Sequence, residues 1–178
     1  MKKIILSLIV IINISSFKSV SQDLKIGYTN VEYILTFLPE TKQVQSEVSA
    51  YGTQLQNQLQ SKITDFQSKA DVFQKSAATM TDLIRADKQE ELQNLQASIQ
   101  KFQTEAQTSI AQREADLFKP LFEKISNAIN VVSERENFTH VFSAGGPGVD
   151  VLLYAKPTDD ISNLVLAELG IDPPSPNN

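Results

Sequence analysis

The chain has 178 residues, of which 41% are hydrophobic and 21% are charged, and it has no cysteine, so disulfide bonds and cysteine-linked lipid are excluded. Its 16 basic and 21 acidic side chains give a net charge of −5. This balance argues against a nucleic-acid partner, because nucleic-acid binding needs a basic surface.

The first 21 residues have the pattern of an export signal. Lys2 and Lys3 precede an apolar run over residues 4–14, and a stretch of small residues ends at Ser21. The run is too short to span a bilayer as a helix. We therefore expect cleavage after Ser21 and an exported, soluble protein of the periplasm. Loss of three lysines with the signal would make the net charge −8, which leaves at most weak contact with a membrane surface.

Residues 22–38 are expected to form the first part of a small body. The segment 24–30 predicts a short strand with Leu24, Ile26 and Tyr28 on one face. A short helix over residues 31–38 follows, with its apolar side facing inward. Pro39 interrupts this helix and is well placed in the first turn of the next one.

Residues 39–136 predict a long helical hairpin that projects as a coiled-coil arm. The helical period lapses at 76–82, the expected tip, where Thr81 is a candidate N-cap. At ~1.5 Å per residue each helix reaches about 55 Å, too far for a globular core to cover. The helices must therefore pack on each other along one narrow apolar seam: Leu55, Leu59, Ile63, Phe66, Phe73, Leu95, Ile99 and Phe102.

Glutamine is abundant on the arm and lies largely outside this seam. It is a good helix former that carries no charge. Two interpretations have equal weight: the glutamines are solvated helix surface, or they provide a wettable surface for weak, non-specific contacts. Apolar residues outside the seam and near the tip are the better candidates for contact with another protein chain: Val72, Leu83, Ile84 and Leu92.

The second part of the body is predicted from residues 137–170. Before it, Pro120 is expected to kink the return helix at the arm root. Strands over 138–144 and 149–155 flank a glycine-rich turn, and a final helix from Thr158 or Asp159 to Leu169 is capped by Gly170. Residues 171–178 predict a disordered tail.

The predicted fold class is thus α+β, with a small β-rich body made from both chain ends. Three short strands and two helices bury little surface, and a three-stranded sheet has two bare edges. We therefore expect the body to form an oligomer through the apolar residues of its strands: Ile26, Tyr28, Val141, Phe142, Leu152 and Tyr154.

The sequence offers no constellation for catalysis, for a metal or for another cofactor. His140 is the only histidine and has no cysteine to join it. Asp159 and Asp160 precede an apolar periodic run and fit the first turn of a helix. Residues 145–148 have no helix directly after them and fit a hairpin turn rather than a phosphate loop. We interpret the chain as a non-enzyme.

Five segments occur in a fixed order around the long hairpin: KIGYTN at 25–30, EYIL at 32–35, PE at 39–40, LFKPLFEKISNAI at 117–129 and LLYAKPTDDIS at 152–162. Together they resemble the Skp (OmpH-like) family of periplasmic chaperones, in its Bacteroidetes-type form. The resemblance spans nearly all of the mature chain up to Gly170. It implies a homotrimer in which three arms enclose a cavity that holds unfolded outer-membrane proteins without ATP and prevents their aggregation. Well-known members have strongly basic arms, whereas these arms mix lysine and arginine with aspartate and glutamate.

The alternative is a structural protein, such as a periplasmic adaptor that bridges envelope components through its coiled-coil hairpin. Adaptors surround that hairpin with several β-rich modules, and this chain predicts only three strands. A scaffold that organises peptidoglycan or surface assembly also stays open.

Overall fold

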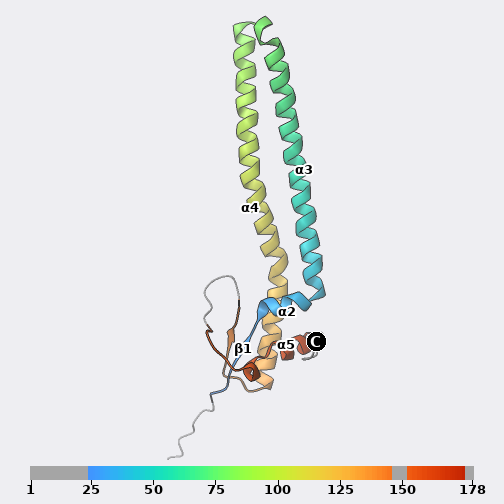
Figure 1. Cartoon of the computed structure of the whole chain (residues 1–178), viewed down its shortest axis with the longest axis vertical. Helices are drawn as coiled ribbons and strands as arrows, with labels where there is room; N and C mark the ends of the chain where they lie inside the picture. The colour runs from blue at the N-terminus through green and yellow to red at the C-terminus, as the bar shows by residue number, and fades with distance from the viewer. Residues whose placement is uncertain (1–23, 146–151, 175–178) are drawn as a thin grey trace, which may run out of the picture.

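The computed structural model describes residues 24–145 and 152–174, so the predicted export signal lies outside the described residues. A long two-helix hairpin projects from a small body, and the body contains the described residues that precede and follow the hairpin (Figure 1). The described chain is mostly helical, with two short strands and two short α-helices in the body.

The arm consists of α3, Pro39–Ser76, and the upper part of α4, Asp82–Arg135. Pro39 occupies the first turn of α3. Backbone N–H groups in a first turn have no partner within the helix, so the missing N–H of proline costs no hydrogen bond there. At the tip, the short 3-10 helix η2, Ala77–Thr79, joins the two helices. The side chain of Thr81 accepts a hydrogen bond from the Ile84 N–H, which confirms Thr81 as the N-cap of α4. The helix then continues through Pro120 without a break. The kink expected at Pro120 stays a prediction.

The two arm helices keep one register over most of their length. Tyr51 and Ser109 share a hydrogen bond of 2.7 Å, Lys69 pairs with Glu91 at 2.9 Å, and Glu47 pairs with Arg113 at 3.5 Å. In each of these pairs the two residue numbers add up to 160. All eight predicted seam residues lie between these helices and are half-buried. Half-burial is the limit for a seam whose side chains have only one neighbouring helix.

The body contains a two-stranded parallel sheet. Strand β1, Ile26–Thr29, pairs with β2, His140–Ser143, in a register that places Tyr28 beside Phe142. Between β1 and β2 the chain passes through α2 and the whole hairpin, which makes the parallel arrangement possible. On the other edge of β1, Tyr28 forms a single bridge to Asp160, and the Ile161 N–H donates to the Tyr28 carbonyl at 2.9 Å.

The sequence predicted three strands in the body, and this prediction is wrong for the described residues, which contain two. Residues 152–155, the described part of the predicted strand 149–155, form no strand, and residues 149–151 lie outside the described residues. Leu153 and Tyr154 are 91% and 83% exposed. An apolar run of this kind favours a strand, but a strand also needs a partner ladder, and this segment has none among the described residues.

The core of the body lies where α2, Val31–Phe37, and α5, Ser162–Glu168, pack against the lower part of α4. Seven apolar residues are at most 1% exposed there: Ile34, Leu38, Ile125, Val132, Ile161, Val165 and Leu166. The packing extends to Ile171, one residue past the boundary predicted at Gly170. Gly170 has a φ of +76°, and the Ile171 N–H bonds to the Leu166 carbonyl, so Gly170 ends α5 as predicted.

The sheet turns a different face to this core than the apolar pattern suggests. Ile26 is 43% exposed, whereas Thr29 is 2% exposed and contacts the Ser162 hydroxyl at 3.2 Å. Gly27 is also buried, and a Cβ there would lie 2.8 Å from the ring of Phe138. A close ring requires glycine at this position. On the opposite face, Leu24 and Ile26 are exposed and Tyr28 is half-buried in a single chain.

The final helix begins later than predicted. Pro157–Asp159 form the 3-10 helix η3, and α5 begins at Ser162. The Asp160 carboxylate accepts a hydrogen bond from the Ser162 N–H at 2.8 Å, so it supports the helix start from two residues upstream. Pro157 and this side-chain bond favour a separate turn before the helix.

Candidate functional site

The four candidate client-contact residues lie near the tip of the arm but do not form one patch. Val72 is 62% exposed on α3, while Leu83 and Ile84, in the first turn of α4, are 82% and 49% exposed. Leu92 is half-buried. Val72 and Leu92 line one small groove of about 160 Å³ together with Phe73 and Met80. The structure thus brings two of the four candidates together.

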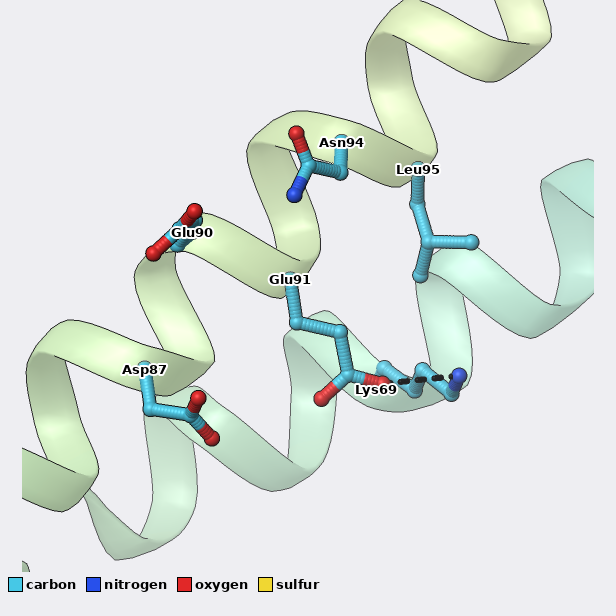
Figure 2. Close-up of a pocket in the computed structure, with 6 residues that line it drawn as sticks. All are labelled: Lys69, Asp87, Glu90, Glu91, Asn94 and Leu95. Carbon is cyan, nitrogen blue, oxygen red and sulfur yellow. Dashed lines mark ion pairs between the residues drawn. The ribbon is translucent and has the colours of Figure 1, made fainter.

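Charged side chains of both signs surround this tip region. Lys69 contacts Asp65 at 3.3 Å and Glu91 at 2.9 Å, and Lys88 contacts Glu91 at 2.7 Å. Figure 2 shows Glu91 reaching across to Lys69, with Asp87, Glu90 and Asn94 on the same helix as Glu91. Hydrogen bonds from Lys88 and then Lys69 lower the pKa of Glu91 to about 2. Since the lysines here have acidic partners, the tip has no strongly basic patch.

A second groove lies in the middle of the arm and is lined by no charged residue. It has a volume of about 640 Å³. Gly52 and Ala106 leave space between the helices, and Leu55, Leu59 and Ile110 supply its apolar surface, with three glutamines beside them: Gln56, Gln103 and Gln107. Sequence reasoning missed this groove, although a glycine inside a helical seam was a signal for it.

A third groove lies at the arm root, between α2 and α4, and we call it the arm-root groove. Its volume is about 480 Å³. Val31 and Leu35 of α2 face Phe118 and Phe122 of α4, with Glu32, Glu114 and two alanines completing the lining. The sequence indicates apolar faces on both helices, but it did not predict a groove between them. Two phenylalanines four positions apart on α4 were the available signal, because they lie on the same side of a helix.

The residues predicted for oligomer contact gather on the body. Ile26, Tyr28, Leu152 and Tyr154 line one groove of about 400 Å³. Phe142 lies beside Tyr28 in the sheet, is 43% exposed, and stacks on the ring of His140 with a centroid distance of 6.5 Å. Val141 differs from the other five, because it packs against the body core. Five of the six residues therefore form a largely apolar outer face.

Neither a metal centre nor a membrane-spanning helix is found in residues 24–145 and 152–174. No three histidine, cysteine, aspartate or glutamate side chains of this part lie close enough together to hold a metal ion. None of its helices combines the length and the apolar character that crossing a membrane requires.

Comparisons with known proteins agree with this architecture. A family model described as "Outer membrane protein (OmpH-like)" matches residues 25–169. No curated protein matches the chain. Among solved structures, the chain is similar to a candidate outer membrane chaperone (OmpH-like) from Caulobacter crescentus CB15. The two share 14% sequence identity with a TM-score of 0.68, over 85% of this chain and 88% of that one, so they share the fold.

Proposed function

Because the chain belongs to the OmpH-like family of outer membrane proteins, we propose that it is a periplasmic chaperone that binds unfolded outer-membrane proteins without ATP. The protein of similar fold is described as a candidate outer membrane chaperone, which supports the same class of function. The observation that carries the proposal is the arm: a long hairpin with a half-buried seam, apolar grooves and exposed apolar side chains, held away from a separately packed body.

The proposed mode of binding is many weak contacts. The apolar surface of the arm is divided among separate grooves of about 160, 480 and 640 Å³. The side chains of Val72, Leu83 and Ile84 add further exposed apolar contacts near the tip. Partial burial of one such side chain contributes on the order of 1 kcal/mol. Several contacts are then needed to hold a client, and each can open independently, so the client is released without an energy source.

We further propose that three copies assemble through the body. The outer face of Ile26, Tyr28, Phe142, Leu152 and Tyr154 would then be covered by other copies, and the arms would enclose a shared cavity. An exposed apolar face of this kind is typical of a protein contact. The number three comes from the resemblance to the chaperone family. Light scattering that shows a monomer at micromolar concentration would contradict this assembly.

The holding function is tested by aggregation. A β-barrel outer-membrane protein unfolded in urea is diluted into buffer with and without an excess of this protein, at low and high salt. We expect suppressed light scattering at both salt concentrations, because the charges on the arm are mixed and screening changes little. Equal aggregation with and without the protein would refute the holding function. Protection that collapses at moderate salt would show that charge dominates binding.

A pull-down separates this function from the structural alternative. The chaperone proposal predicts capture of many unfolded outer-membrane clients. Recovery of a single stoichiometric partner would instead favour an adaptor that bridges envelope components.

A further inference from the structure

The arm-root groove offers two aromatic rings, whereas the tip groove has one, that of Phe73, and the groove in the middle of the arm has none. The rings of Phe118 and Phe122 lie 6.1 Å apart between centroids, and Phe122 is 47% exposed. Val31 and Leu35 form the opposite wall. A volume of about 480 Å³ leaves room for one or two large apolar side chains.

Two carboxylates flank this apolar surface. Glu32 belongs to α2 and Glu114 to α4, and both line the groove. Neither takes part in an ion pair within residues 24–145 and 152–174. By contrast, the nearby carboxylates Glu40 and Glu47 pair with Lys124 and Arg113.

We propose that the arm-root groove is a binding site for client segments in which an aromatic or large aliphatic side chain lies next to lysine or arginine. The apolar side chain packs against Phe118 and Phe122, and the neighbouring cation contacts Glu32 or Glu114. The negative charge of the groove favours apolar segments with a neighbouring lysine or arginine. An apolar segment flanked by acidic residues would be repelled from the same surface. This inference rests on the proposed chaperone function and adds a sequence preference to it.

The test uses two fluorescent probe peptides and the protein expressed from its full-length sequence. Both peptides are short, unstructured and contain the same phenylalanines; in one they are flanked by lysine and in the other by glutamate. Fluorescence anisotropy at low salt measures binding. We expect the lysine peptide to bind more tightly, by up to about fivefold for each carboxylate engaged, and this preference should shrink at high salt.

Two double variants separate the charge from the apolar surface. E32Q/E114Q should bind both peptides equally, and it should fold normally since neither side chain has an ion-pair partner among the described residues. F118S/F122S should weaken the lysine peptide about tenfold, as expected for loss of aromatic burial. The matched controls are E123Q and V131S on the same helix, outside the groove; Val131 is 47% exposed, as is Phe122. Both controls should bind like the unchanged protein.

Each other outcome overturns the inference. It is wrong if the unchanged protein does not distinguish the two peptides, or if E32Q/E114Q keeps the preference. It is also wrong if F118S/F122S retains its melting temperature but changes the association state without altering peptide binding, because the groove would then be a contact between copies. If the protein suppresses aggregation of an unfolded client but binds the two peptides equally, only this inference is refuted. If it neither suppresses aggregation nor distinguishes the peptides, the chaperone function is refuted as well.

Discussion

The body and the arm use one helix in two different ways. In its lower part, α4 buries Ile125 and Val132 to 1% and 0% exposure, whereas Ile99 and Phe102 in the arm are only half-buried. Below, α4 packs against α2 and α5; above, its side chains meet α3 alone. The number of neighbouring helices, rather than the type of residue, sets the degree of burial.

This difference suggests that the body provides most of the stability and that the arm provides the binding surface. The body has a closed apolar core that resembles that of an ordinary small domain. The arm keeps much of its apolar surface in contact with water. A narrow apolar seam and ion pairs such as Lys69–Glu91 hold its two helices together. A surface that is already rigid and partly apolar can bind other chains without first reorganising.

The largest expected effect compares the same substitution in the two regions. Ile125→Ala should lower the free energy of unfolding by about 2–5 kcal/mol, because it opens a cavity in a closed core. Ile99→Ala on the same helix should cost about half as much or less, since water already reaches that side chain. Urea unfolding followed by circular dichroism measures both. Equal losses would break the distinction between core and seam.

A smaller effect is expected at the tip. Single substitutions Val72→Ser, Ile84→Ser or Leu92→Ser should each weaken client binding by less than about fivefold, while the triple variant should weaken it about tenfold or more. Val131→Ser, remote from the tip on the lower part of α4, is the control and should have no effect. The affinity for an unfolded outer-membrane protein is the measurement. One single variant that abolishes binding would replace the picture of many weak contacts with that of a defined site.

The smallest expected effect concerns the pH dependence of the tip. The pKa of Glu91 is lowered to about 2 in the folded arm by Lys88 and Lys69, against about 4.3 in an unfolded chain. A lowered pKa means that the carboxylate stabilises the arm above about pH 4.3 and that this contribution is lost as pH falls towards about 2. Amide hydrogen exchange at the tip, corrected for intrinsic rates, should therefore accelerate over this range. Glu91→Gln should remove the acceleration, and an unchanged pH profile in that variant would contradict the assignment.

Local signals in the sequence were enough to predict the hairpin. The helical period of Leu55, Leu59 and Ile63 identifies the seam, because an isolated pair of helices allows only one apolar stripe. Pro39, Thr81 and Gly170 mark helix ends through backbone chemistry that acts within a few residues. Such signals do not depend on how distant parts of the chain meet.

The structure of the body could not be predicted from local stretches of the sequence, because it depends on contacts between distant residues. The parallel pairing of β1 with β2 joins residues separated by the entire arm, and Thr29 is buried because it meets Ser162. The apolar run that includes 152–155 indicated a strand, but the described residues supply no partner strand for it. The arm-root groove was hidden for a similar reason: its two walls come from α2 and α4, which the sequence alone does not place side by side.

Shortening the arm tests the central claim most directly, namely that the arm holds clients and the body assembles the protein. Deleting residues 55–76 together with 84–105 preserves the register, because in each deletion pair the residue numbers again add up to 160. The shortened protein is then compared with the unchanged one by light scattering, both for its own association state and for suppression of aggregation of a urea-unfolded β-barrel protein. We predict the same association state and much weaker protection, because only the arm-root groove remains to bind clients. Undiminished protection by the shortened protein, or loss of its assembly, would contradict the account.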